Sequence, residues 1–316
     1  MKQPILSIIV PTRDNIENLE DGFLKSVIIN TNNINNIELV FVVDEDDKKT
    51  IDFLSNNQAL KELTFLQILK RKRSNNITED YYNYGAKKSY GFFVMPGADD
   101  IQIDTPNYDL ILIKTREGMI KTEGVHKKHY LLIKTFGKGN AGAGFCCFPI
   151  LTRASIDLLG YFLAPPAITG WGADWFIDKI YSTVNKVAVP TTPINIQHVS
   201  KHSGDITQTA EARYSRMAAI SQAVPNCKHN PKIYVEMVKA IFLIIAENME
   251  QYTPAAVYED FSNASATPDT QKAANISHPK LEKHPKIFLE AIYSIKQAVY
   301  NNRPGAPGNL IKKKNE

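Results

Sequence analysis

The chain has 316 residues, of which 43% are hydrophobic and 22% are charged, and its formal net charge is +4. This composition is typical of a globular protein with one main domain and an appendage, and it excludes the disordered and fibrous classes. No long basic run is interleaved with aromatic residues, so we expect no nucleic-acid partner.

The first hundred residues alternate apolar runs with helical patterns. ILSIIV (5–10), ELVFVV (38–43), LTFLQI (63–68) and FFVM (92–95) read as strands, and the second is a continuous apolar run, as expected of a strand covered on both faces. Between the first two, apolar residues recur at helical spacing from Ile16 to Val27. Strands that alternate with helices in this way predict a parallel sheet with crossover helices.

The pattern changes after residue 105. We predict strands without long crossover helices at 108–114, 129–136 and 145–151, helices at 152–159 and 173–184, and extended pieces at 187–190 and 194–198. From about 205 the chain reads as helical, most clearly at 208–223, 232–248 and 284–300. The predicted domains are therefore residues 1–204, a helical extension at 205–302 and a flexible basic tail at 303–316.

Two groups of acids follow directly on predicted strands. Asp44 begins the run DEDD, and Asp99 and Asp100 follow the break at Pro96 and Gly97. The carboxyl ends of parallel strands are where ligands bind in open α/β sheets. The paired acids are therefore either exposed turn residues or ligands of a hard cation that also binds phosphate oxygens. Asp44 is either a surface acid or an acceptor for a base or ribose.

Four segments, in this order and spacing, resemble the glycosyltransferase family 2 pattern on the GT-A fold: SIIVPTRDN (7–15), ELVFVVDED (38–46), NYGAKKSYGFFVMPGADDI (83–101) and GWGADWFIDKI (170–180). The resemblance covers about residues 4–205. It implies an α/β, GT-A type, Rossmann-like mixed and mainly parallel sheet flanked by helices, followed by a C-terminal helical extension. It also implies an inverting glycosyltransferase that uses a nucleotide-diphosphate sugar, with UDP-sugars favoured.

The resemblance also implies site residues. Those matching the donor nucleotide site are Pro11, Thr12, Arg13, Asp44, Asn83, Gly85 and Ala98. The family's Asp-x-Asp motif falls on Gly97-Ala98-Asp99, so the first aspartate is missing. We expect Mn²⁺ or Mg²⁺ to be bound by Asp99, with Asp100 as a neighbour and His198 as a further ligand; His202 is the second candidate for that histidine.

The acceptor side of the expected site lies at the start of the helix at 173–184. Asp174 matches the family's catalytic base, although Ala173 departs from the usual acidic pair, and a first-turn acid favoured by the helix dipole is the simpler alternative. Trp171, Gly172 and Trp175 would contact the sugar or acceptor, with core packing as the alternative for the two tryptophans. By analogy, the acceptor is a hydroxyl of a glycan or lipid-linked molecule in cell-surface polysaccharide or lipopolysaccharide synthesis.

Two other functions stay open. A sugar nucleotidyltransferase would need a glycine-rich basic loop after the first strand, and PTRDN has no glycine. A non-catalytic nucleotide-sugar-binding protein fits the missing first aspartate.

The cysteines, the apolar runs and the C-terminal region bear on the cellular compartment and on possible membrane contact or dimerisation. Cys146, Cys147 and Cys227 form no paired framework, and the longest apolar runs fall far short of the ~20 residues that cross a bilayer, so we expect a cytoplasmic protein. The basic tail leaves peripheral contact with the inner face of a membrane open. The apolar helix faces leave a homodimer open.

Overall fold

A computed structural model of the protein describes residues 3–124, 128–137, 146–168 and 172–198, together with single positions between 233 and 247. The chain divides into two compact units, Met1–Ile233 and Tyr234–Glu316. In the second unit the described positions are helical and fall within the helix predicted at 232–248; Met237, Ala240 and Ile244 are buried there. The helices predicted at 208–223 and 284–300 and the tail lie outside the described residues.

The first unit contains the strands that the structure describes. They are β1 (Leu6–Thr12), β2 (Ile37–Asp44), β3 (Leu66–Arg71), β4 (Phe93–Pro96), β5 (Ile101–Ile103), β6 (Leu132–Ile133), β7 (Ile150–Thr152), β8 (Val187–Ala188) and β9 (Ile196–His198). The helices are α1 (Ile16–Asn18), α2 (Lys25–Asn30), α3 (Lys48–Asn56), α4 (Gln58–Lys61), α5 (Tyr84–Lys88), α6 (Tyr108–Glu123), α7 (Arg153–Leu159) and α8 (Ala173–Thr183). Wider π-helical turns, Leu19–Leu24 and Thr78–Asn83, join α1 to α2 and lead into α5, and a 3₁₀ turn, Ile34–Asn36, precedes β2.

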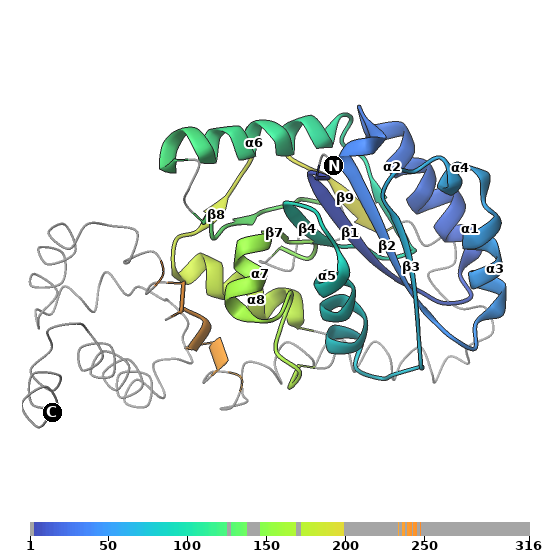
Figure 1. Ribbon diagram of the computed structural model, residues 1–316. Coiled ribbons are helices and arrows are strands. Elements are labelled where there is room, and N and C mark those ends of the chain that lie inside the picture. Colours follow the sequence, from blue (N-terminus) through green and yellow to red (C-terminus); the bar gives the residue numbers. More distant parts are fainter. Residues whose placement is uncertain are drawn as a thin grey trace, which may run out of the picture. The chain divides into compact units, whose positions relative to one another are not determined.

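The main sheet has seven strands in the order β3-β2-β1-β4-β7-β6-β8. The first four are parallel, β7 is antiparallel to both of its neighbours, and β6 is parallel to β8. Figure 1 shows α5, α7 and α8 in front of this sheet and the long α6 along its upper end. The expected α/β class, with a mixed and mainly parallel sheet flanked by helices, is confirmed.

The core lies on both faces of β2, which is buried along its whole length. On one face Phe41 packs edge-on against Phe23, with ring centroids 6.4 Å apart. Consecutive strand residues point to opposite faces, so Val42 faces the other way and meets Gly85 of α5. A β-carbon at Gly85 would lie 2.5 Å from Cγ2 of Ile9, so a glycine is what lets α5 approach the sheet this closely.

One sequence prediction is wrong. The segment 108–114, predicted as a strand, begins α6, in which Tyr108 and Leu112 are fully buried one turn apart. Over only seven residues, the run YDLILIK is compatible both with a buried strand and with the spacing of apolar residues in a helix. The segment TREGMIKTE that follows favours a helix and continues it. Asp109 anchors the first turn of α6 to the segment before β2, because its carboxylate accepts hydrogen bonds from the backbone N–H groups of Asn32 (2.9 Å) and Asn33 (3.1 Å).

The other strands predicted after residue 105 are present but shorter than predicted. Within the predicted strands at 129–136 and 145–151, only β6 and β7 form, whereas α7 and α8 match the predicted helices closely. Among the residues that the structure describes, none of the helices has the length and apolar character needed to span a bilayer.

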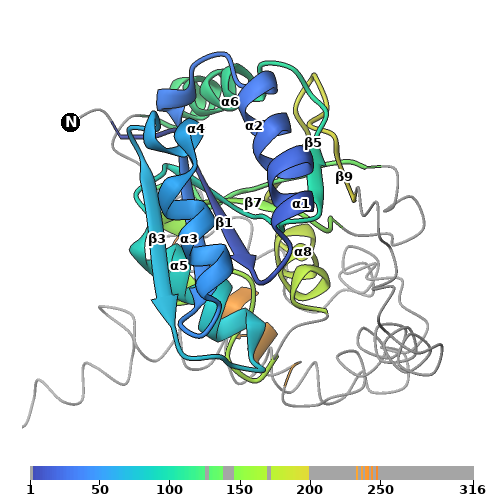
Figure 2. The same cartoon turned by 90° about the vertical axis from the view of Figure 1, so that its right-hand side faces the viewer.

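A second, two-stranded sheet pairs β5 with β9 in antiparallel fashion. Figure 2 shows α2 on one side of β5 and β9 on the other. In the register of this pair Ile101 lies opposite His198. The pairing therefore brings His198, the last residue of β9, next to Asp100, which immediately precedes β5.

Candidate active site

Three parallel strands end at the same edge of the sheet. Thr12 ends β1, Asp44 ends β2, and the turn that carries Asp99 follows β4. The central position of β1 between β2 and β4 lets the residues after it reach both acids. The hydroxyl of Thr12 donates to Oδ2 of Asp99 at 2.9 Å, and the guanidinium of Arg13 donates to Oδ2 of Asp44 at 2.7 Å.

Asp99 is held by two side-chain donors. Its Oδ2 accepts from Thr12, and its Oδ1 accepts from the amide of Asn15 at 2.9 Å. Burial raises the pKa of Asp99 to about 6, and these two hydrogen bonds oppose the rise. Its ionised form is therefore costly at neutral pH in the absence of a counter-charge, and a cation would offset that cost.

Asp100 lies against His198. Oδ1 of Asp100 is 3.4 Å from Nδ1 of His198, and this carboxylate raises the pKa of the imidazole although burial lowers it. The structure thus brings together two of the expected metal ligands from positions 98 residues apart in the sequence. His202 lies outside the described residues.

The carboxylates at this turn would suit a divalent cation. Carboxylate oxygens are the ligands that Mg²⁺ and Mn²⁺ prefer, and such ions commonly bind through one or two carboxylates while substrate phosphates complete the coordination. Asp99 and Asp100 supply the carboxylates. Within the described ranges, no group of three or more Asp, Glu, His or Cys side chains is arranged to hold a metal by itself.

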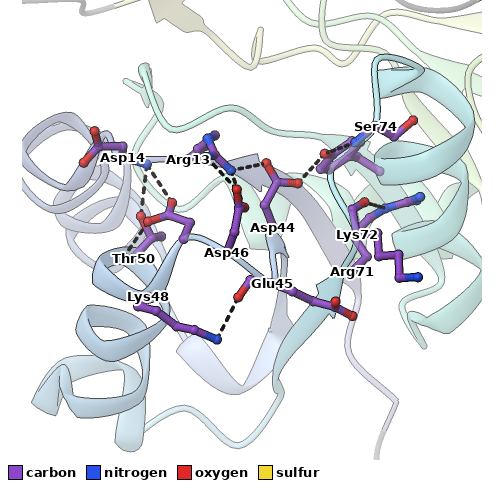
Figure 3. A network of polar contacts seen from close by, with 12 residues as sticks. Arg13, Asp14, Asp44, Glu45, Asp46, Lys48, Thr50, Arg71, Lys72 and Ser74 are labelled. Carbon is purple, nitrogen blue, oxygen red and sulfur yellow. Dashed lines mark hydrogen bonds and ion pairs between the residues drawn. The ribbon is translucent and has the colours of Figure 1, made fainter.

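Arg13 connects the acids after β2. Its guanidinium contacts Oδ2 of Asp44 and both carboxylate oxygens of Asp46, the latter at 2.7 and 3.1 Å (Figure 3). Asp44 is only 3% exposed, and its Oδ1 accepts from the hydroxyl of Tyr81. Both oxygens of Asp44 therefore have a protein partner, and each keeps a second lone pair for a ligand donor.

Tyr81 is a contact that the sequence analysis missed. Its hydroxyl accepts from the backbone N–H of Ser74 at 3.1 Å and donates to Asp44, so it joins the loop after β3 to the end of β2. The two adjacent tyrosines in DYYNYG, just ahead of the Asn-x-Gly motif, are the sequence signal. Tyrosines within a helical pattern otherwise read as core residues.

Asn83 is fully buried, and its amide is used within the protein. The amide nitrogen donates to Glu79 (2.7 Å) and to the carbonyl of Ala164 (2.9 Å). The amide oxygen accepts from the backbone N–H groups of Phe162 (2.9 Å) and Leu163 (3.3 Å). The structure therefore places Asn83 as a clamp between its helix and the 162–164 segment, and Gly85 as a spacer against the sheet. The hydrogen-bonding positions of the Asn83 amide are thus used within the protein.

The missing first aspartate has a steric explanation. A β-carbon on Gly97 would lie 2.8 Å from Cγ2 of Ile8 and 3.0 Å from Cγ2 of Val10. The Gly97 N–H donates to the carbonyl of Ile9 at 2.7 Å, which fixes this close approach to β1. The next residue, Ala98, is half-buried against the core. An acidic side chain at position 97 would therefore point into methyl groups of the interior.

Replacing Gly97 by Ala should lower the free energy of unfolding by about 1–3 kcal/mol, because the added methyl group collides with two β-branched side chains. Gly118 in α6 is the matched control, since nothing lies within 4 Å of a β-carbon there. Gly118→Ala should stabilise the protein by about 0.5–1 kcal/mol. Chemical denaturation measures both changes, and equal effects of the two substitutions would contradict the packing explanation.

Asp174 lies in the first turn of α8. Gly172 caps this helix with a φ of 94°, a left-handed conformation that glycine adopts without strain. Oδ1 of Asp174 accepts from the backbone N–H of Trp175 at 2.8 Å. Burial raises the pKa of Asp174 to about 6, and the nearby charge of Asp178 adds to the rise. A carboxyl group with this pKa suits a general base near neutral pH.

The expected aromatic contacts are only partly described. Trp175 is 5% exposed, which suits the core-packing alternative rather than a stacking surface for a sugar. Trp171 lies outside the described residues.

Tyr82 links the acids of the two halves of the site. Burial raises the pKa of this phenol, and the negative charges of Asp99, Asp100 and Asp174 raise it further. The three acids therefore lie within electrostatic reach of one half-buried side chain. Asp44 belongs to the adjoining network around Arg13 and Tyr81, the residue before Tyr82.

Comparison with solved structures finds proteins of similar fold. The mannosyltransferase PcManGT from Pyrobaculum calidifontis, solved with GDP-Man and Mn²⁺, aligns over 96% of this chain and 88% of its own, with a TM-score of 0.50 and 14% identity. TarS 1-349 from S. aureus, solved with UDP-GlcNAc, aligns over 77% and 81% respectively, with a TM-score of 0.45 and 16% identity. Neither a protein-family model nor a curated protein matches the sequence. The chain thus has an α/β fold similar to that of a solved glycosyltransferase.

Proposed function

We propose that the chain is an inverting glycosyltransferase of the family 2 type that uses a nucleotide-diphosphate sugar. The observation that supports this most strongly is that the charges of Asp99, Asp100 and Asp174 all act on the phenol of Tyr82, which also donates to the Gly97 carbonyl just after β4. The carboxyl ends of parallel strands are where ligands bind in such sheets. The fold similarity to a mannosyltransferase adds to this support. The resemblance of the four sequence segments supplies the family.

In this proposal the two sides of the site have different tasks. The turn Pro11–Arg13 and Asp44 bind the nucleotide, and Asp99, Asp100 and His198 hold Mn²⁺ or Mg²⁺. The bound cation supplies positive charge to the leaving diphosphate. Asp174 accepts the proton of the acceptor hydroxyl while that oxygen forms a bond to the anomeric carbon. The bond from this carbon to the diphosphate breaks on the opposite face, so the anomeric configuration inverts.

The acceptor in this proposal is a hydroxyl of a glycan or lipid-linked molecule, as in cell-surface polysaccharide synthesis. A second candidate, a non-catalytic nucleotide-sugar-binding protein, is favoured by one observation. The packing around Gly97 leaves no room for the acid that the family carries there. The two candidates differ in whether Asp174 affects turnover.

A panel of UDP-, GDP- and dTDP-sugars tests the proposal through thermal unfolding, with and without Mn²⁺. A donor at a hundred times its dissociation constant adds about 2.7 kcal/mol of stability. We therefore expect one donor class to raise the melting temperature by about 5–10 °C when Mn²⁺ is present. If no nucleotide sugar changes the melting temperature at millimolar concentration, both candidate functions fail.

A further inference from the structure

The two adjacent tyrosines Tyr81 and Tyr82 contact different parts of the candidate site. Tyr81 donates its hydroxyl to Asp44, on the side expected to bind the nucleotide. Tyr82 donates its hydroxyl to the carbonyl of Gly97 at 2.8 Å, at the turn that leads into Asp99 and Asp100. Consecutive side chains of the π-helical turn Thr78–Asn83 thus contact the end of β2 and the turn after β4.

The turn after β4 is held by contacts of its backbone and of its acids, including the contact of Asp100 with His198. The Gly97 N–H is bonded to the carbonyl of Ile9, and the Asp99 carboxylate is bonded to Thr12 and Asn15. Gly97 has no side chain to anchor the turn, and its packing admits none. Its carbonyl is held by Tyr82, so the hydroxyl of Tyr82 fixes the Gly97–Ala98 peptide that leads into the paired acids.

We propose that Tyr82 is a positioning residue for the cation site: its hydroxyl holds the Gly97 carbonyl and so keeps Asp99 and Asp100 oriented for Mn²⁺. This inference rests on the proposed function. Burial and the surrounding acids keep the Tyr82 phenol protonated, so it remains a hydrogen-bond donor across the pH range in which the acids titrate.

The test compares Tyr82→Phe with Tyr81→Phe, because each removes one hydroxyl from the same helical turn. Mn²⁺ binding to the full chain is followed by electron paramagnetic resonance of free Mn²⁺. UDP or GDP, whichever base the donor panel selects, is held at saturation for every protein. We expect Tyr82→Phe to weaken Mn²⁺ binding about threefold to tenfold, the effect of losing one neutral hydrogen bond. Tyr81→Phe should stay within about twofold of the wild type for Mn²⁺ but bind the nucleotide more weakly.

Further measurements separate positioning from a general loss of structure. Tyr81→Phe loses two hydrogen bonds and Tyr82→Phe loses one, so the melting temperature should fall at least as far in Tyr81→Phe, and a general loss of structure would weaken Mn²⁺ binding at least as much in that variant. High Mn²⁺ should restore nucleotide binding in Tyr82→Phe and not in Tyr81→Phe. Equal Mn²⁺ affinity in Tyr82→Phe and the wild type, or equal weakening in both variants, overturns the role of Tyr82 while leaving the proposed function in place. A wild type that binds no Mn²⁺ with either nucleotide overturns both.

Discussion

Replacing Asp174 by Asn should lower the rate of sugar transfer about 10²- to 10⁴-fold, the usual contribution of a general base. The amide has similar size and can still accept the hydrogen bond from the Trp175 N–H, but it cannot take a proton from an acceptor hydroxyl. Donor affinity should stay within about threefold, because the proposed role of Asp174 is at the acceptor hydroxyl and not at the donor. Initial rates and calorimetric donor titrations measure the two quantities.

The pKa of Asp174 gives this substitution two further signatures. The group is active when ionised, so wild-type turnover should rise with pH through about 6 and then level off, and this limb should vanish in the variant. The pKa of Asp174 in the folded state, about 6, lies above the ordinary value of an aspartate in the unfolded chain, so this carboxyl disfavours folding increasingly as pH rises from 4 to 6. Asp174→Asn should therefore be more stable than the wild type at pH 8, by up to about 3 kcal/mol, and equal to it near pH 3.5.

Asp157→Asn is the matched control, since Asp157 is an exposed acid on α7 outside the site. It should leave turnover unchanged at every pH. Unchanged turnover in Asp174→Asn would instead favour the non-catalytic candidate.

Removing the divalent cation should lower turnover about 10²- to 10³-fold, because charge on the leaving diphosphate then develops without compensation. Mn²⁺ added after the chelator should restore the rate. Asp99→Asn should need much more Mn²⁺ for the same rate, since the variant loses a half-buried carboxylate at the proposed cation site. Stopped assays of nucleoside diphosphate release measure the effect. Turnover that is unchanged through chelation and Mn²⁺ addition would rule out a cation role for Asp99.

The sequence predicts the parallel half of the sheet well because local signals agree there. The apolar run of β2 indicates a strand, and the spacing from Ile16 to Val27 indicates a helix. The start of α6 is ambiguous, since its seven residues are compatible with both a strand and a helix, and only the packing in the folded protein distinguishes the two. Contacts distant in the sequence are also hidden: no local pattern shows that His198 lies opposite Ile101 and so beside Asp100.

The candidate site was predicted unevenly for similar reasons. Residues at or just after the ends of strands, such as Asp44 and Asp99, can be placed from strand order alone. Asn83 and Gly85 belong to a recognisable motif, but only the structure shows that one clamps the 162–164 segment and the other lets α5 approach β1 and β2. Tyr82 belongs to no recognised motif, and its proposed role follows only from its hydrogen bond to the Gly97 carbonyl.

We propose that acids from separate segments of the chain form one site that transfers a sugar. The most direct measurement follows release of nucleoside diphosphate from the donor selected by thermal unfolding, with glycan and lipid-linked acceptors, in the wild type, Asp99→Asn and Asp174→Asn. We predict release in the wild type only with a divalent cation, and its loss in each variant. A wild type that binds the donor yet releases no nucleoside diphosphate with any acceptor would contradict the claim.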